Sequence, residues 1–246
     1  MELRGEYFST IYISCHELKN ATHQHGPYVG FYIKDPKQRH IHKAVVRDRV
    51  LHHAIFSILN PIFELTFIPR SFSCRIGEGT HRGIDVLEKM LIKTSENYTK
   101  PCFALKCDIR KFFDSVNHSI LLNIIKKRVK DNKAIWLLNE IIESYSVAVS
   151  PRERETNVPR KGLPIGNLTS QLFANIYLNE LDQFIKQRMK IKDYVRYTDD
   201  FVIVAEKSLD LKEIINPIQL FLKNELKLEI HPQKISIKRF HQGVDF

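Results

Sequence analysis

Two adjacent carboxylates, Asp199 and Asp200, stand between two apolar runs of the sequence. Tyr-Val-Arg-Tyr precedes the pair and Phe-Val-Ile-Val-Ala follows it, and both runs are rich in strand-forming residues. Aspartate favours turns, so an exposed hairpin turn is one explanation of the pair. The apolar flanks favour another, because carboxylates in a partly enclosed place raise each other's pKa unless a cation neutralises them. Hard oxygen ligands in this arrangement suit Mg²⁺.

A third acid, Asp108, ends a short apolar run that begins at Pro101 and predicts a buried strand. We expect this strand to lie beside the hairpin that carries the acidic pair. Three carboxylates at one place can hold two Mg²⁺ ions, with Mn²⁺ as a substitute. Such ions activate a 3′-hydroxyl and stabilise the leaving pyrophosphate in an in-line displacement. The three acids therefore predict a two-metal site for nucleotidyl transfer.

The remaining sequence predicts an α+β fold that could position these acids. A basic hairpin is expected over residues 28–42, after an N-terminal helix, and a last hairpin over residues 227–240. Pro61 is expected to end the first long helix, and Pro217 to kink the last one. Apolar residues recur at helical spacing in segments that cover about residues 45–59, 79–93, 118–129, 133–145, 168–190 and 210–226.

The composition favours a polyanionic partner. The chain of 246 residues carries 38 Lys and Arg against 28 Asp and Glu, a formal net charge of +10, so nucleic acid is the leading candidate. A basic surface that only keeps the protein soluble is the alternative. The four cysteines lack Cys-x-x-Cys spacing, which argues against a zinc knuckle. The sequence has neither a signal peptide nor an apolar run of about 18 residues, so we expect a soluble cytoplasmic protein that does not enter a membrane.

Several stretches of the chain resemble the motifs of reverse transcriptases, in the order of that family. They cover residues 35–55, 67–87, 103–118, 162–182, 194–204 and 228–246. The resemblance implies a right-hand polymerase whose fingers occupy residues 1–100, with finger motifs at about 28–92. It implies a palm over residues 101–240, with some fingers elements interleaved, whose antiparallel sheet is backed by helices. Residues 241–246 would begin the palm–thumb junction, and the thumb is expected to be absent from this chain.

The same resemblance implies roles for the residues around the acidic pair. Asp108, Asp199 and Asp200 would hold the two metal ions together with the carbonyl of Ile109. Lys234 stands where the family carries a lysine that protonates pyrophosphate, and an ordinary exposed lysine is the alternative. These residues make up the implied catalytic centre.

A ring under the incoming sugar is also implied, at Phe113. A 2′-hydroxyl would collide with this ring, which would favour deoxynucleotides; an aromatic in the core is the alternative and fits Phe112 better. The implied ligands are an RNA template, a DNA or RNA primer and deoxynucleoside triphosphates. The further candidates for nucleotide binding are Lys37, Arg39, Arg47, Ile165, Gly166 and Gln171, and those for template or primer binding are Arg75, Arg82 and Tyr197. Solvated surface residues are the alternative for each of the cations.

One motif departs from the pattern of many reverse transcriptases. Ile165 stands where they carry Gln, in the string Ile-Gly-Asn-Leu-Thr-Ser-Gln. This string resembles the enzymes of diversity-generating retroelements, which copy an RNA template with frequent errors at adenines and act with a small basic accessory protein. Isoleucine lacks the amide of Gln, so we expect a looser hold on the base pair. A group II intron, retron or phage-defence reverse transcriptase is one alternative, and a non-catalytic RNA-binding protein of the same fold is another.

Overall fold

The computed structural model describes residues 16–34, 37–147 and 159–243, in two compact units. The expected N-terminal helix lies largely outside the described residues, as do the turn at residues 35–36 and most of the loop before residue 162. Each unit takes two separate stretches of the chain. The assignment of residues 1–100 to fingers and 101–240 to palm stays a prediction.

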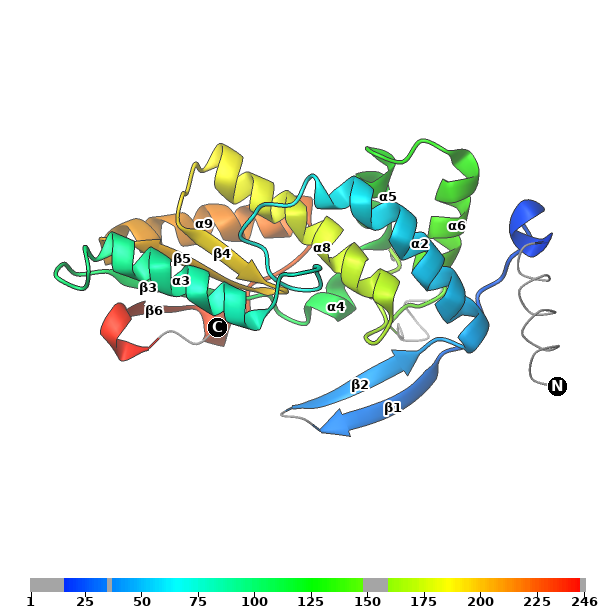
Figure 1. Ribbon diagram of the computed structural model, residues 1–246, viewed down its shortest axis with the longest axis horizontal. Helices are drawn as coiled ribbons and strands as arrows, with labels where there is room; N and C mark the ends of the chain where they lie inside the picture. Colours follow the sequence, from blue (N-terminus) through cyan, green and yellow to red (C-terminus); the bar gives the residue numbers. More distant parts are fainter. Residues whose placement is uncertain (1–15, 35–36, 148–158, 244–246) are drawn as a thin grey trace. The chain divides into compact units, whose positions relative to one another are not determined.

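The first unit joins Met1–Glu64 to Asn117–Phe173. Its antiparallel hairpin pairs β1 (Val29–Lys34) with β2 (Gln38–Lys43), as predicted, and every residue of β1 is exposed (Figure 1). The helices of this unit are α2 (Val46–Glu64), α5 (His118–Lys126), α6 (Asn132–Glu143) and the first residues of α8 (Leu168–Gln183). The strand β1 therefore presents its side chains to solvent, while Ile41 and His42 of β2 are partly buried.

The helix α2 corrects one prediction. Pro61 does not end it, because the helix continues to Glu64. A proline removes one N–H from the helical ladder but leaves the following residues free to remain helical. Phe63, which follows the proline, is 3% exposed, so its burial stabilises the last turn. Both α5 and α6 begin as predicted, since the side chains of Asn117 and Asp131 accept the N–H of a residue in the first turn.

The second unit joins Leu65–Val116 to Ala174–Phe246 around a four-stranded antiparallel sheet. The strands lie in the order β4 (Tyr194–Tyr197), β5 (Asp200–Ala205), β3 (Phe103–Asp108) and β6 (Ser236–Arg239). The predicted strand that ends at Asp108 and the predicted hairpin with the acidic pair are both confirmed. The prediction of a last hairpin over residues 227–240 is wrong. The strand β6 pairs with β3 over Phe103–Lys106, and the segment before β6 makes an isolated bridge from Ile230 to Ile109.

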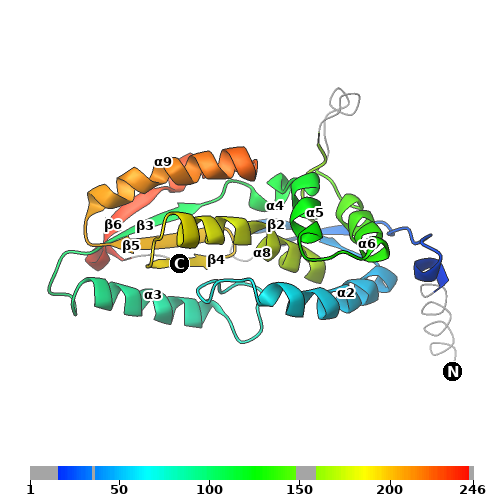
Figure 2. The ribbon, with the colours of Figure 1, turned by 90° about the horizontal axis from the view of Figure 1, so that it is seen from above.

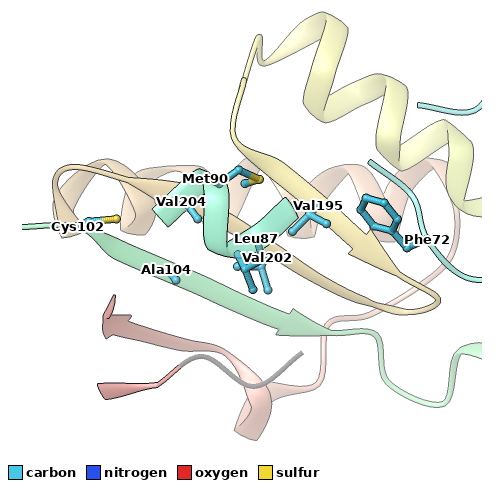
Figure 3. Close-up of a cluster of buried hydrophobic side chains, with 8 residues drawn as sticks. All are labelled: Phe72, Leu87, Met90, Cys102, Ala104, Val195, Val202 and Val204. Carbon is cyan, nitrogen blue, oxygen red and sulfur yellow. The ribbon is translucent and has the colours of Figure 1, made fainter. Parts of the chain in front are cut away.

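Helices cover both faces of this sheet. The helix α3 (Thr80–Thr94) packs Leu87 and Met90 against alternate residues of three strands, as Figure 3 shows. The helix α9 (Ser208–Glu225), which contains Pro217, lies along the opposite face (Figure 2). Burial on both faces explains why β5 is a nearly continuous apolar run. Short helical turns complete the unit: α4 (Phe112–Ser115), the π-helical end of α8 at Phe184–Arg188, η2 (Pro232–Lys234) and η3 (Phe240–Gln242).

Candidate active site

The sheet register brings the predicted catalytic acids together. Asp108, the last residue of β3, lies directly opposite Asp200, the first residue of β5. Asp199 precedes Asp200 in the turn, and its carbonyl accepts the N–H of Ile109 at 3.2 Å. An antiparallel pair with its hairpin turn at the same end therefore collects acids that lie 91 and 92 residues apart in sequence (199 − 108 and 200 − 108).

The acids lie in a partly enclosed place, as their apolar flanks predict. Burial raises the pKa of Asp199 to about 6, and the charges of Asp200 and Asp108 act in the same direction. Burial likewise raises the pKa of Asp200. The cluster therefore favours a positive charge beside it, since every added cation lowers the cost of keeping these carboxylates ionised.

Lys234 supplies one such charge. Its ammonium group lies 2.5 Å from Oδ2 of Asp108, and this hydrogen bond raises the pKa of the lysine. The N–H of His231, just before η2, donates to the Asp108 carbonyl at 2.8 Å and fixes this turn beside β3. The structure thus places Lys234, the predicted proton donor, within hydrogen-bonding distance of Asp108, a predicted metal ligand.

The donor set suits a hard divalent cation. Asp108, Asp199 and Asp200 offer carboxylate oxygens. The other predicted ligand is the carbonyl of Ile109, the residue after Asp108, which is buried. Within residues 16–34, 37–147 and 159–243, no group of three His, Cys, Asp or Glu side chains is already arranged around one metal position. The strand pairing therefore brings the three acidic residues together, while the side chain of Asp108 forms an ion pair with Lys234. Mg²⁺ or Mn²⁺ would be held by these carboxylates and would supply charge neutralisation and activation of a bound hydroxyl.

Phe113 lies four residues after Ile109, in α4, and is partly buried. Its neighbour Phe112 is 1% exposed and meets it edge to face, with ring centroids 5.3 Å apart. The core role is therefore Phe112's, as expected. The contact of Phe113 with a sugar stays a prediction.

The candidates for template or primer binding all lie in the second unit. The Arg75 guanidinium donates to the carbonyls of Ile68 and Ser71 at 2.9 and 2.6 Å, which ties it to its own loop. Arg82 is largely exposed and pairs with Glu78 at 3.0 Å. Tyr197 pairs with Asp200 in the sheet. Its hydroxyl accepts a hydrogen bond from Thr80 at 3.0 Å. Arg82 has the most open side chain of the three.

The other nucleotide-binding candidates lie in the first unit. Lys37 and Arg39 are exposed at the start of the hairpin strand β2, where a phosphate could reach them. Arg47 is held instead by Glu17 and Asp48, at 3.3 and 3.2 Å. Its predicted contact with a triphosphate would have to compete with these two acids. Gln171 is exposed near the start of α8.

The Ile-Gly-Asn string packs against the end of the hairpin in the first unit. The Ile165 carbonyl accepts the N–H of His42 at 2.8 Å. Gly166 has a φ of +109°, and a Cβ atom there would lie 2.5 Å from the Cγ2 atom of Ile41. Glycine is thus required by both the backbone conformation and the contact with β2. A close approach to a nucleotide stays a prediction.

Two groups of residues escaped the sequence reasoning. Asn167 is buried; its amide oxygen accepts the N–H of Ala44 at 3.1 Å and its amide nitrogen donates to the His42 carbonyl at 2.7 Å. Arg196 and Asp182 form a fully buried ion pair in the second unit. A signal was present for Arg196, because a charged residue stands inside an apolar run that predicts a buried strand.

The comparisons with known proteins agree with this geometry. Residues 33–246 match the family model of reverse transcriptase (RNA-dependent DNA polymerase). The chain therefore belongs to the reverse transcriptase family, whose members are nucleotidyltransferases. None of the helices in the described ranges is long and apolar enough to cross a membrane.

Three relatives of this chain share 25% identity with it or less. Protein YkfC of Escherichia coli is 25% identical over 94% of this chain and 68% of its own length. The group II intron-encoded protein LtrA of Lactococcus lactis is 23% identical over 93% of this chain and 47% of its own. The solved structure of apo telomerase from Candida tropicalis shares the fold, with a TM-score of 0.61 at 14% identity over 91% of this chain and 46% of that one. The chain thus spans between about half and two thirds of these relatives.

Proposed function

We propose that this chain carries the polymerising centre of an RNA-directed DNA polymerase that adds deoxynucleotides to a primer 3′ end on an RNA template. The observation that carries the proposal is the cluster of Asp108, Asp199 and Asp200 at one end of an antiparallel sheet. A protein that only bound RNA would gain nothing from repelling carboxylates in a partly buried place. Membership of the family supports the same activity.

Each residue has a defined part in the proposed reaction. The primer 3′-hydroxyl gives up its proton to water, its oxygen bonds to the α-phosphorus, and the bond from that phosphorus to the pyrophosphate oxygen breaks. The three aspartates would hold two divalent ions, which would supply neutralisation of the negative charge on the attacking and leaving oxygens. Lys234, already beside Asp108, donates its proton to the departing pyrophosphate. Phe113 excludes a 2′-hydroxyl from the incoming nucleotide.

For the subtype, we propose a diversity-generating retroelement enzyme that makes error-prone cDNA. The observation behind this proposal is Ile165, whose side chain has no hydrogen-bonding group and whose carbonyl is already engaged by His42. A base pair would then be held less tightly than by the Gln of other reverse transcriptases. The proposed partners are an RNA template, a primer, deoxynucleoside triphosphates and a small basic accessory protein.

A group II intron reverse transcriptase is the second candidate. Its supporting observation is that LtrA, a group II intron-encoded protein, matches 93% of this chain. The two candidates share the catalytic centre and differ in the fidelity and the template that they predict. The error pattern of the product therefore separates them.

Primer extension by the full chain tests the proposal. The reaction contains a primed RNA, Mg²⁺ and four deoxynucleotides, with a DNA template of the same sequence as the comparison. We expect cDNA from the RNA template with errors concentrated opposite adenines. Errors spread evenly over the four template bases would favour the second candidate. A folded chain that binds the primed RNA without extending it would contradict a polymerase function.

A further inference from the structure

A buried ion pair lies directly behind the acidic turn. The Arg196 guanidinium donates to both carboxylate oxygens of Asp182, from Nε at 2.8 Å and from Nη2 at 2.7 Å. Both side chains are fully buried. Tyr194 also donates its hydroxyl proton to Asp182, at 2.6 Å. The pair therefore links the edge strand β4 to the helix α8 within the second unit.

The same guanidinium reaches the turn itself. Its Nη1 group donates to the Thr198 carbonyl at 2.9 Å, one residue before Asp199. Its Nη2 group also donates to the hydroxyl of Ser71 at 2.9 Å. One planar fork thus connects α8, the loop before α3 and the turn that carries the catalytic acids, which a point-charge ammonium could not do.

The turn needs such support because of Thr198. Its φ is +53°, in the left-handed region that a β-branched residue seldom adopts. A residue in this region persists only where its surroundings determine it. The surroundings here are the bond from Arg196 and the bond from the Thr198 hydroxyl to the Ser73 hydroxyl at 2.7 Å. Ser73 is in turn fixed by Asn175, which donates to its carbonyl at 2.8 Å.

We infer that Arg196, anchored by Asp182, is a positioning residue that holds the left-handed turn at Thr198 and so sets Asp199 for binding divalent cations. The inference rests on the proposed function in one respect, the metal-holding role of the aspartates. Stability alone does not account for the pair, since a buried ion pair contributes little net stability compared with apolar residues of similar size. The contact with Thr198 gives the pair a local purpose.

The test is the affinity of the full chain for Mn²⁺, titrated as the metal alone and followed by electron paramagnetic resonance. This readout measures metal binding itself and does not depend on primer extension. Arg196→Lys keeps the charge and loses the fork, so we expect Mn²⁺ affinity to fall roughly tenfold. Tyr194→Phe is the matched control, because it removes a bond to Asp182 without touching the turn, and should leave the affinity unchanged.

Repeating the titration in a Thr198→Gly variant makes the test specific to the turn. Glycine adopts a left-handed φ without strain, so Thr198→Gly removes the need for support. In the Thr198→Gly background, Arg196→Lys should then lower the Mn²⁺ affinity by about twofold or less. A double-mutant cycle measures this coupling between the two residues. An equal loss in both backgrounds would overturn the inference, as would a folded Arg196→Lys chain with wild-type affinity.

Ser73→Ala covers the case in which Arg196→Lys does not fold. It leaves the ion pair in place and removes the second bond to Thr198, so Mn²⁺ affinity should fall by roughly twofold to threefold. Unchanged affinity in that folded variant would contradict the inference. A chain that shows these effects but makes no cDNA would contradict the polymerase proposal alone. A polymerase whose Mn²⁺ affinity ignores Arg196 would contradict this inference alone.

Discussion

Asp108 and Asp200 are directly opposed residues of the antiparallel strands β3 and β5. Directly opposed side chains in such a pair have Cβ atoms about 5 Å apart, and like charges there oppose strand pairing. The hydrophobic contacts of the rest of β3 and β5 outweigh this repulsion, because these strands are buried on both faces. The pairing is therefore stable for reasons unrelated to the acids, and these keep their preference for a cation, of which the Lys234 ammonium beside Asp108 is one.

Replacing Phe113 with Val should admit ribonucleotides. The smaller side chain leaves room for a 2′-hydroxyl, so discrimination against ribonucleotides should fall by roughly 10- to 100-fold. Single-nucleotide incorporation with a deoxy- or ribonucleoside triphosphate measures the ratio. Phe63→Leu is the control: its ring is buried at the end of α2, so the change should lower stability and leave the ratio unchanged. A Phe113→Val chain with wild-type discrimination would place the sugar gate elsewhere.

Replacing Ile165 with Gln should raise fidelity. The amide adds hydrogen-bonding groups, while the backbone bond from His42 to the Ile165 carbonyl does not depend on the side chain. We expect misincorporation opposite adenine to fall by roughly threefold or more, about 0.7 kcal/mol of discrimination. Sequencing of the cDNA gives the error rate, and Ile191→Gln, at a partly exposed site outside the motif, serves as the control. An unchanged error rate at adenines would remove the support for the looser grip.

Acid should destabilise the first unit through His52. This side chain is 1% exposed, and burial lowers its pKa to about 4, with His25 and His23 acting in the same direction and Asp48 against it. The unfolded chain binds a proton near pH 6.5 and the folded chain only near pH 4, so stability should fall as the pH drops through this window. The full loss is about 3 kcal/mol.

The contribution of His52 is measured by comparison with its exposed neighbour. Urea unfolding between pH 7 and pH 4 should show a shallower decline for His52→Gln than for the wild-type chain. His53→Gln should decline almost as steeply as the wild type, because His53 is exposed and its charge contributes least to the lowered pKa of His52. Equal slopes for all three chains would show that His52 is not buried as a neutral group.

Local sequence patterns predicted most of the elements and the catalytic acids. The three acids could be found because Asp108 ends a strongly apolar strand, Asp200 begins another, and Asp199 lies in the turn directly before it. The pairing of β6 with β3 could not be predicted, since it depends on contacts between residues at least 130 apart in sequence (236 − 106 = 130 at the nearest pair). The role of Arg196 could not be predicted either, because its partner Asp182 lies on another element and only the folded chain shows the contact.

Asp199 is the acid on which the proposed metal site depends most, and one rate constant measures its contribution. The rate constant for adding a single deoxynucleotide to a primed RNA with Mg²⁺ is determined for the full chain, for Asp199→Asn and for Asp210→Asn, an exposed acid in the first turn of α9. Loss of a metal ligand should remove several kcal/mol of transition-state stabilisation, so Asp199→Asn should be slower by roughly 10³-fold or more. Asp210→Asn should match the wild type. Undiminished synthesis by a folded Asp199→Asn chain would contradict the two-metal site proposed here.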